Sequence, residues 1–356
     1  MSEPSGRRRS AAPTLQDIAN EAGVSAMAVS VVLNSSASST RVSDATRARI
    51  IEAAKKLKYR PNAVARGLQR RRMDTIGVVG VVDSEEINVY FLELLNGVIK
   101  GVDEHGQNLM VFSIHNWSED ENRIASFCDG RVDGMLLLAP RPTPHLAQLL
   151  PHHTPIVAIH NNAELPGVPN ISTDSEAGAV DLMQYLIGFG HRRILHIAGP
   201  VEVTDAKQRV CGYKRALKEA GIPFETEFVV HGAYTYSSGR ECMEAWLKAH
   251  EGAELPTAVF GANDAMAAGA IEALTDVGYS IPGDVSVIGF DDSLMARVCN
   301  PRLTTLRQPL REMGQRAVDI LLREIDTSTT PPSEVFPTEL VIRDSVGPAR
   351  TTTIKI

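Results

Sequence analysis

The regular pattern of the chain begins with two short amphipathic segments joined by a tight turn. In TLQDIANEA, apolar residues recur at the three- and four-residue spacing of one helix face, behind a plausible N-cap at Thr14. Gly23 follows where a left-handed C-cap is needed, and Ser25 can cap the next helix. That second helix turns three apolar residues inward: Val29, Val32 and Leu33. Two short helices joined by GVS form the helix-turn-helix pattern.

A third amphipathic helix is predicted in VSDATRARIIEAAKKLKY, with Ser43 as its cap. Its inward positions are Ile50, Ala53, Ala54 and Leu57. Pro61 ends this helix, and Asn62 can cap a further segment of about two turns that reaches Gln69. A segment this short is not helical alone in water, so this connector is expected to fold only against a partner.

The second helix presents few polar groups on its outward side. Its outward positions are Ala26, Met27, Ser30, Val31 and Asn34. The serine and asparagine side chains, together with Ser25, suit phosphate oxygens, which position a protein without reading sequence. The apolar side chains can pack on thymine methyl groups but cannot make the bidentate hydrogen bonds that identify guanine or adenine. We therefore expect a second element to take part, together with this helix, in recognising the DNA sequence.

The connector is the natural choice for that second element. Leu68 stands among arginines in YRPNAVARGLQRRR. An exposed apolar side chain in a basic segment suits insertion between base steps in a minor groove. A solvated linker that carries a stray leucine fits this stretch equally well.

From Asp74 onward, short apolar runs alternate with helical periods. The predicted strands are TIGVVGVV, NLMVF, VDGMLLLA, PIVAIH, RILHIA, TAVFGA and DVSVIGF. The predicted helices include VYFLELLNGVIKGVDEHG, AGAVDLMQYLIGFG, AKQRVCGYKRALKEAG and NDAMAAGAIEALTDVG. This alternation is typical of a doubly wound α/β architecture, and two such sets indicate two lobes that bind ligands off the carboxyl ends of their strands. The expected fold is thus an all-α helix-turn-helix head with a hinge helix, joined to an α/β body of two lobes.

Charge divides the chain at the same place as the pattern. Residues 1–73 hold fourteen Lys and Arg but only five Asp and Glu, a formal charge of +9, whereas the remainder carries −16. A basic head on an acidic body is typical of a polyanion-binding module fused to a globular domain. A solvated basic face without a partner is less favoured, because RRR runs at 7–9 and 70–72 flank the same small unit.

Composition limits the classes of protein to which the chain can belong. A length of 356 residues allows two or three domains, and 43% hydrophobic with 22% charged residues is ordinary for a soluble protein. No apolar run approaches the ~18 residues of a membrane span, and the N-terminal arginines precede no apolar signal region, so we expect a cytoplasmic protein without a membrane partner. The cysteines lie far apart without metal-ligand spacing, which favours reduced thiols and no metal: Cys128, Cys211, Cys242 and Cys299.

Catalytic motifs are missing from the sequence. It contains no GxxxxGK[ST], no GxGxxG after a strand, no HExxH, no GxSxG and no paired cysteines, so neither an enzyme nor a cofactor is expected. Asp291 and Asp292 could do acid–base work, but scattered carboxylates are usually solvated or capping groups. His152 and His153 lack companions at metal spacing.

The N-terminal region contains, in this order, the stretches TLQDIANEAGVSAMAVSVVLN and RVSDATRARIIEAAKKLKYRPNAVARGL. It resembles the N-terminus of the lactose/galactose repressor (LacI/GalR) family of bacterial transcription regulators. The resemblance implies that Ala26 and Met27 read bases in the major groove, while Val31 replaces a base-reading Arg of many members. It implies that Ala65 and Leu68 enter the minor groove. It implies DNA-facing, phosphate-facing or supporting roles for Thr14, Ser25, Ser30, Asn34, Ser43, Thr46, Tyr59 and Asn62.

The resemblance continues through VDGMLLLAP, PNISTDSEAGA, LIGFGHRRILHIAGP, FGANDAMAAGAIEAL, IPGDVSVIGFDDSLMA and PRLTTLRQPLREMG. It implies a periplasmic-binding-protein-like body with chain crossovers near 173–174, 308–310 and 333–337. The expected divisions are a basic tail (1–13), a DNA-binding head (14–60), a connector (61–73) and the body (74–356). Within the body, the N-lobe should take about 74–173 and 309–335, and the C-lobe about 174–308 and 336–356.

The same resemblance places an effector between the lobes. The positions that it implies for effector contact are Asn88, Tyr90 and Phe91 on the N-lobe wall, and Asp205, the anchoring Arg209, the stacking Tyr234, Asn263 and Asp291 on the C-lobe wall. His160 stands where many sugar-responsive members have Asp, and we include it in the set. Plainer roles stay open: Tyr90 and Phe91 as core, Arg209 as a surface ion pair, and Asp291 as a helix cap.

These expectations combine into one function. The chain is expected to be a homodimeric repressor that docks two heads on near-palindromic double-stranded operator DNA and responds to a sugar, a sugar derivative or a nucleobase-like effector. Two other classes stay open from the residues alone. One is a small-molecule binding protein without a DNA role, and the other is an enzyme with its active site in the cleft.

Overall fold

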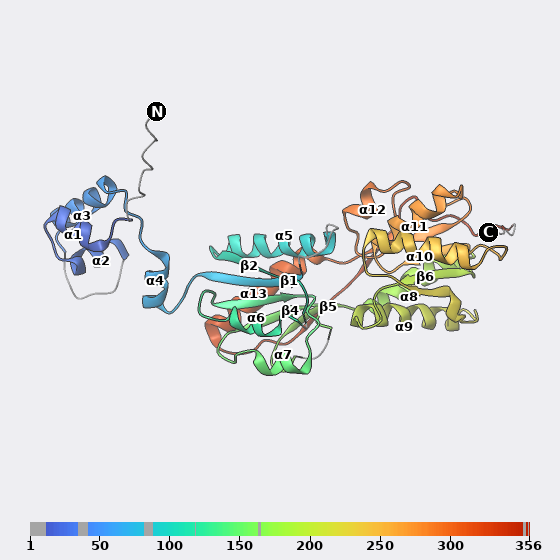
Figure 1. Ribbon diagram of the computed structural model, residues 1–356, viewed down its shortest axis with the longest axis horizontal. Coiled ribbons are helices and arrows are strands. Elements are labelled where there is room, and N and C mark those ends of the chain that lie inside the picture. Colours follow the sequence, from blue (N-terminus) through green and yellow to red (C-terminus); the bar gives the residue numbers. More distant parts are fainter. Residues whose placement is uncertain are drawn as a thin grey trace, which may run out of the picture. The chain divides into compact units, whose positions relative to one another are not determined.

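The computed structural model describes residues 12–34, 42–81, 88–117, 119–162, 165–351, 354 and 356. Its internal contacts divide the chain between Met73 and Asp74 into a small helical unit and a larger α/β unit (Figure 1). The expected basic tail lies outside the described residues up to position 11.

Three helices form the head: α1 (Leu15–Ala22), α2 (Ala26–Asn34) and α3 (Asp44–Lys56). Thr14 and Asp17 form a reciprocal capping box at the start of α1, and Gly23 ends the helix in the left-handed region at φ 63°. The core contains the inward residues that the sequence predicts, including Ile18, Val29 and Ile50. These three side chains are fully buried, so a small domain obtains a closed core.

Two details of the head differ from the prediction. Leu33 and Leu57, expected inward, are only partly buried, although both pack against the core. Ala26, expected outward, is half-buried and also packs against it, because it begins α2 directly after the tight turn. The connector contains the predicted two-turn helix, α4 (Ala63–Arg70), which Asn62 caps by accepting a hydrogen bond from the Ala65 N–H at 3.2 Å.

The N-lobe is built on a six-stranded sheet with strand order β11-β5-β4-β3-β1-β2, in which every neighbouring pair is parallel. Its strands are β1 (Thr75–Val81), β2 (Asn108–Ile114), β3 (Gly134–Leu138), β4 (Ile156–Ile159), β5 (Asn170–Thr173) and β11 (Glu334–Phe336). Helices α5 (Val89–Glu104) and α13 (Leu310–Thr327) pack on one face, and α6 (Glu121–Ser126) and α7 (Pro144–Leu149) on the other. Val78 faces the first pair and Val79 the second, as the alternation of a strand requires.

The C-lobe repeats this plan on a parallel sheet with strand order β7-β6-β8-β9. Its strands are β6 (Ile194–Ala198), β7 (Val229–His231), β8 (Ala258–Gly261) and β9 (Ser286–Ile288). Helices α8 (Ser175–Gly188) and α9 (Thr204–Glu219) cover one face, and α10 (Tyr236–Ala249) and α11 (Asp264–Asp276) the other, as Figure 1 shows. The short elements η1 (Thr226–Phe228) and α12 (Leu294–Val298) complete this lobe.

The chain passes between the lobes at three places. β5 leads into α8 at Asp174, and β10 (Thr305–Arg307) leads into α13 through Gln308 and Pro309. The third passage joins β11 to β12 (Glu339–Val341), which pairs antiparallel with β10. We expected the C-lobe to resume at 336, but Phe336 still pairs with Thr173 in the N-lobe sheet, which makes that boundary wrong by at least one residue.

Several elements were absent from the predicted set, among them α10, β7, β10, β11 and β12. The four strands have three residues each, which is too short for an alternating pattern to be recognised. No described helix combines the length and the apolar character that crossing a membrane requires.

Helices α5 and α13 of the N-lobe pack with their backbones in contact. A Cβ atom added at Gly97 would lie 2.1 Å from the Arg311 carbonyl oxygen, and one at Gly314 would lie 2.4 Å from the Leu94 carbonyl oxygen. Only a residue without a side chain allows this approach, because the facing atoms are main chain and cannot turn aside.

We expect Gly97→Ala to lower the free energy of unfolding by about 1–3 kcal/mol, because the methyl group forces the two helices apart. Gly188→Ala is the matched control, since a Cβ atom there meets no atom within 4 Å, and it should stay within about 1 kcal/mol of the wild type. Urea denaturation of both variants measures the difference. Equal stabilities would show that the helix contact is not as close as described.

Candidate functional site

Four large apolar residues of the described head and connector are exposed, namely Met27, Ile51, Val64 and Leu68. Met27 on α2 is 67% exposed and Leu68 on α4 is 81% exposed, in a unit with a formal charge of +9. Val64 on α4 is also exposed, and so is the Ala65 backbone and methyl group. Exposed apolar side chains on a basic surface suit contact with bases beneath a phosphate backbone.

Most of the polar residues expected to face DNA also have a structural role. Ser25 Oγ accepts a hydrogen bond from the Ala28 N–H at 3.2 Å, which caps α2. Ser43 caps α3 through the Thr46 N–H and donates its hydroxyl hydrogen to Thr46 Oγ1 at 2.9 Å. With Thr14 and Asn62, these caps place hydroxyl and amide groups at the N-termini of all four helices, which favour anions.

The remaining expected DNA-facing residues are less exposed or lie outside the description. Ser30 and Val31 are half-buried on α2, and Tyr59 is half-buried and packs against the head core. The Asn34 side chain lies outside the described residues. Ala26, Val31 and Tyr59 can therefore reach DNA with only part of their surface.

In the body, left-handed backbone conformations gather at the carboxyl ends of the strands. Ala139 follows β3, His160 follows β4, Tyr234 lies in the loop after β7, and Asp291 and Asp292 follow β9. Their φ angles are 47°, 51°, 65°, 115° and 55°, values that residues with a Cβ atom rarely adopt. Strain of this kind persists where the surroundings hold it, and it commonly collects at ligand sites.

Tyr90 of the N-lobe lies near Asp205, Arg209 and Asp291 of the C-lobe, and we call the region between these residues the cleft. Its N-lobe wall centres on Tyr90 and His160. The Tyr90 hydroxyl hydrogen-bonds to His160 Nδ1, and His160 Nε2 lies 3.2 Å from the Thr173 hydroxyl. Burial lowers the pKa of His160 and raises that of Tyr90 well above its usual range, so both side chains are neutral at pH 7.

Asn88 and Phe91, the other expected contacts on this wall, have structural roles. Asn88 caps α5 by accepting a hydrogen bond from the Phe91 N–H at 3.0 Å. The Phe91 ring belongs to the N-lobe core and covers Gly80 so closely that a Cβ atom there would come within 2.3 Å of it. The core alternative therefore describes Phe91 better than it describes Tyr90. Trp117, which lies on the loop after β2, is buried among core side chains.

The C-lobe wall centres on Arg209 of α9. Its side chain is only 3% exposed, its guanidinium carbon lies 3.7 Å from the centre of the Phe290 ring, and it donates a hydrogen bond to the Ala262 carbonyl. The alternative of a surface ion pair is therefore wrong. The Tyr234 ring lies 6.0 Å from the same guanidinium carbon, on the cleft side of Gly199.

Tyr234 and Asn263 divide their roles. The Tyr234 hydroxyl is buried and has no hydrogen-bond partner among the described residues, and burial raises its pKa to about 12. Asn263 caps α11 through the Met266 N–H at 2.9 Å and donates to the Tyr234 carbonyl at 3.0 Å. Asn263 thus uses both ends of its amide to hold the loop, and Tyr234 presents a free hydroxyl.

The Asp291 carboxyl group is almost fully buried, and its pKa is perturbed. Burial raises its pKa to about 6, against the opposing influence of Arg209 and a hydrogen bond from Gln308. Its Oδ1 accepts that bond at 2.7 Å, whereas Ser293 stands at the N-cap of α12, so the helix-cap alternative is wrong. Burial and the neighbouring Asp291 also raise the pKa of Asp264, which is fully buried beneath it.

The two walls form one electrostatic neighbourhood. After burial, the influences that raise the Tyr90 pKa are the carboxylates of Asp205 and Asp291, which lie on the opposite lobe. Arg209 acts in the other direction. The structure thus brings Tyr90 close to three residues that lie more than 100 positions away in the sequence.

Sequence reasoning missed several polar residues of the cleft, above all Thr173 and Gln308. The Thr173 hydroxyl donates to Gln308 Oε1 at 2.6 Å, and both side chains are 4% exposed. Their positions at two crossovers were the available signal, because residues at the passages between lobes must meet there. Residue type and spacing gave no indication that they pair.

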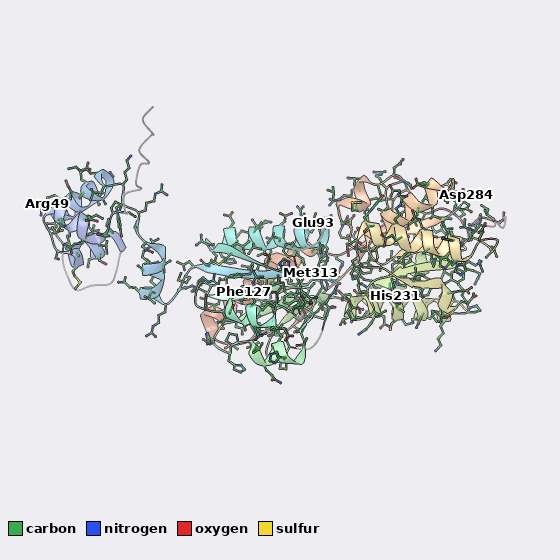
Figure 2. All side chains as sticks on the ribbon, in the orientation of Figure 1. Arg49, Glu93, Phe127, His231, Asp284 and Met313 are labelled. Atoms are coloured by element: carbon green, nitrogen blue, oxygen red, sulfur yellow. The ribbon has the colours of Figure 1, made fainter. Side chains whose placement is uncertain are left out.

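Contacts at both margins of the cleft hold the lobes together. On one side, Asn162 Oδ1 accepts a hydrogen bond from the Thr204 N–H at 2.9 Å, and its carbonyl accepts one from the Thr204 hydroxyl at 2.8 Å. On the other, Glu93 of α5 (labelled in Figure 2) pairs with Arg297 of α12 at 3.8 Å, and within its own lobe it also pairs with Arg311 of α13 at 2.5 Å. Lobe opening breaks contacts of the first kind, as it does the ion pair of Arg141 with Glu202 at 3.4 Å.

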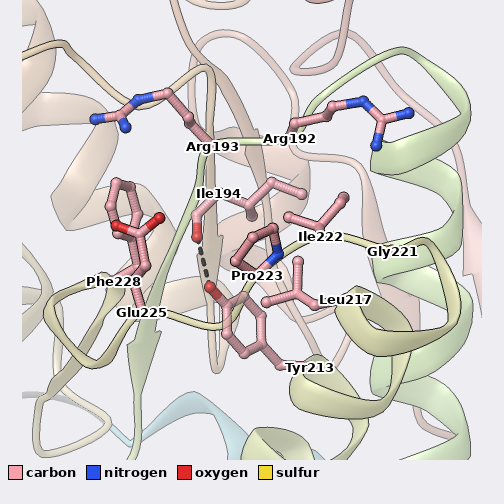
Figure 3. A pocket seen from close by; sticks show the side chains of 10 residues that line it. All are labelled: Arg192, Arg193, Ile194, Tyr213, Leu217, Gly221, Ile222, Pro223, Glu225 and Phe228. Carbon is pink, nitrogen blue, oxygen red and sulfur yellow. Dashed lines mark hydrogen bonds between the residues drawn. The ribbon is translucent and has the colours of Figure 1, made fainter.

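A separate cavity of about 240 Å³ lies at the opposite edge of the C-lobe sheet (Figure 3). It is bordered by Ile194, the first residue of β6, and by Tyr213, whose hydroxyl donates to the Ile194 carbonyl at 2.8 Å. The strands of this sheet are parallel, so the amino edge and the cleft are at opposite ends of the lobe. Among the described residues, no three His, Cys, Asp or Glu side chains are grouped so that they could hold a metal ion.

The protein has a basic helix-turn-helix head, a capped connector helix and two lobes with parallel sheets around a polar cleft. These features define the class of a ligand-controlled DNA-binding regulator. Comparisons agree with this class: residues 14–62 match bacterial regulatory proteins of the lacI family, and residues 183–346 match a periplasmic binding protein-like domain. Catabolite control protein A of Priestia megaterium is 34% identical over 93% of this chain and 98% of its own length. The ribose operon repressor of Escherichia coli (strain K12) is 35% identical over 89% and 94%.

Solved structures show the same likeness. A lac repressor dimer bound to operator and the anti-inducer ONPF matches with a TM-score of 0.81 and 27% identity, over 94% of this chain and 99% of that chain. A complex of the transcriptional regulator CelR with cellobiose matches with a TM-score of 0.70 and 32% identity, over the same shares. The chain belongs to the LacI family of transcription regulators, which confirms the predicted fold and the predicted function of an effector-controlled, DNA-binding repressor.

We expect Asp291→Asn to become more stable relative to the wild type as the pH rises. The raised folded-state pKa means that the carboxyl group favours the fold while protonated and loses that contribution between about pH 4 and pH 7. The variant should gain roughly 2–4 kcal/mol relative to the wild type over this range, from about 1.4 kcal/mol per pKa unit. Urea denaturation at several pH values measures the gain.

Asp120→Asn serves as a control of opposite sign. A backbone hydrogen bond from His115 lowers the pKa of Asp120, so removing this carboxylate should cost more stability at pH 7 than at pH 3. Parallel pH dependence in the two variants would contradict the assignment of a raised pKa to Asp291.

Proposed function

We propose that this chain is a homodimeric repressor in which the connector helix α4 carries the response of the cleft to operator DNA. The observation that carries the proposal is Leu68, 81% exposed on a two-turn helix that follows the basic head in the sequence. An isolated helix of this length is marginal in water, so its helical form needs a partner. The similarity to a lac repressor dimer bound to operator supports the dimer and the DNA partner.

In this proposal, two heads dock in adjacent major grooves and two copies of α4 meet over the minor groove between them. Met27, with the exposed parts of Ala26 and Val31, packs on thymine methyl groups. Leu68, with Ala65, enters the minor groove and opens a base step. Because α2 offers few groups that read bases, much of the specificity comes from the ease with which the central step deforms.

The effector binds between the lobes and is a sugar, a sugar derivative or a nucleobase-like compound. Arg209 supplies hydrogen-bond donors, Asp205 and Asp291 accept hydrogen bonds from hydroxyl or amino groups, and the Tyr234 ring offers an apolar face. Tyr90 closes the site from the N-lobe. His160, Asn88, Phe91 and Asn263 belong to the supporting set, because each is held by protein groups.

Effector binding changes the closure of the lobes, and closure sets the spacing of the two connectors. The lobes are joined by few contacts, such as Asn162–Thr204 and Glu93–Arg297, so a bound molecule of modest affinity can shift their equilibrium. We infer that the cleft binds its ligand without chemical conversion. We place the protein in the cytoplasm, where operator DNA is found.

We expect Leu68→Ala to weaken operator binding tenfold or more, since a homodimer loses two apolar side chains from the minor groove and each tenfold step is about 1.4 kcal/mol. The operator is selected by the full-length chain from random duplexes, and its affinity is measured by fluorescence anisotropy. Gln69→Ala, on the same helix, is the matched control and should bind normally. Full affinity of the Leu68 variant, or circular dichroism that shows no gain of helix on adding DNA, would contradict the proposed role of the connector.

We expect a thermal-shift screen of the full-length chain against ribose, cellobiose, other sugars, sugar acids and nucleobases to find a ligand. A ligand at 100 times its dissociation constant stabilises the protein by roughly 2.7 kcal/mol. Arg209→Lys should abolish the shift, because an ammonium group cannot make bidentate hydrogen bonds. Arg215→Lys, the same change on the exposed face of α9, should keep it. Turnover of a compound would instead favour an enzyme.

A further inference from the structure

A chain of four hydrogen bonds runs through the cleft from the N-lobe to the C-lobe. The Tyr90 hydroxyl bonds to His160 Nδ1, and His160 Nε2 lies 3.2 Å from Thr173 Oγ1. Thr173 Oγ1 lies 2.6 Å from Gln308 Oε1, and Gln308 Nε2 lies 2.7 Å from Asp291 Oδ1. These hydrogen bonds thus join helix α5, the last residue of strand β5, the loops that follow β4 and β9, and a crossover segment.

The direction of these bonds follows from the acceptor at the end of the chain. An ionised carboxylate can only accept, so Gln308 must turn its NH2 group to Asp291 and its carbonyl oxygen to Thr173. The single hydroxyl hydrogen of Thr173 is then donated to Gln308, and Thr173 must accept from His160. His160 therefore carries its hydrogen on Nε2, and its Nδ1 accepts the hydroxyl hydrogen of Tyr90.

Burial makes this direction strict. His160 is 2% exposed, Thr173 and Gln308 are 4% exposed, and Asp291 is 6% exposed, so these groups depend on one another for hydrogen bonds. The direction requires a neutral imidazole, and burial lowers the pKa of His160 as that requires. Gln308 also donates its backbone N–H to the Asp291 carbonyl at 3.3 Å, so both its main chain and its side chain hold the same residue.

We propose that Gln308 is a positioning residue of the effector cleft. It holds the Asp291 carboxylate in place and sets the direction of the four hydrogen bonds, so that the Tyr90 oxygen faces the effector as a hydrogen-bond acceptor. The second part rests on the proposed function. The hydroxyl hydrogen of Tyr90 is already committed to His160, so only oxygen lone pairs remain on the cleft side. The effector group that meets Tyr90 is therefore a donor, such as a hydroxyl or an amino group, and a carboxylate or carbonyl oxygen is rejected there.

The first test reads the His160 tautomer by NMR in the full-length chain labelled with ¹⁵N-histidine, with His160→Gln to assign its signals among the ten histidines. We expect a protonated Nε2 and an unprotonated Nδ1 at neutral pH. In Thr173→Val, which has nearly the same shape but no hydroxyl, the preference for this tautomer should be lost. If His160 of the wild-type protein is protonated on Nδ1, the hydrogen bonds run in the opposite direction, which would overturn the proposal.

The second test uses the charge of the Gln308 partner. Gln308→Glu sets two carboxylates against each other, whereas Gln308→Met removes the hydrogen bonds without adding charge. We expect the Glu variant to melt at least about 3 °C below the Met variant at pH 8, with the gap closing below pH 6, where one carboxyl group takes a proton. A gap that does not change with pH would refute the contact between Gln308 and Asp291.

Other charged and titratable groups face Asp291 from the surrounding elements. They are Asp205 and Arg209 of α9, Asp264 of α11, Tyr234 of the loop after β7 and Tyr90 of α5. These groups are the same in both Gln308 variants, so comparing the variants cancels their own titration. Neither readout uses DNA or a ligand: a failed effector screen would count against the proposed function, and a wrong tautomer against this inference alone.

Discussion

Buried polar groups must find partners, and in this protein that requirement falls on the places where the chain passes between the lobes. Two of the three passages bring polar side chains, Thr173 and Gln308, into a region that water scarcely reaches. Gln308, which lies in the second passage, meets this requirement for both, since it bonds to Thr173 at the end of β5 and to Asp291 in the loop after β9. The walls of the cleft are therefore not independent surfaces, because they share hydrogen bonds through the chain that connects them.

In the head, the same surface residues can serve two purposes. Thr14, Ser25, Ser43 and Asn62 cap helices, and in the proposed function they also meet DNA phosphates. A cap leaves the other N–H groups of the first turn unpaired, and these groups with the helix dipole favour an anion. The same residues can thus shape the head and position it on a polyanion, which leaves the apolar Met27 and Leu68 to distinguish sequences.

Much of the molecule could be predicted from local patterns. The caps of the head helices, the two-turn connector helix and the strands β1, β3, β4, β6 and β8 follow from spacings within about ten residues. The cleft residues Arg209 and Asp291 were predicted only through resemblance to a family, because no spacing relates residues 82 positions apart. Short strands such as β7 and β11 were not predicted, since three residues show no clear pattern by themselves, and the equally short β9 was predicted only because it lies in the longer run DVSVIGF.

The sequence alone determined where the helices of the head and connector begin, which of their faces are apolar, and that a basic head precedes an acidic body, since these properties depend on neighbours in the chain. Only the tertiary structure decided that Phe91 joins the core, that Asn263 supports the Tyr234 loop, and that His160 bonds to Tyr90 and Thr173. The reason is physical. A polar side chain can bond to any suitable group in reach, and the winding of the strands decides which distant groups come into reach.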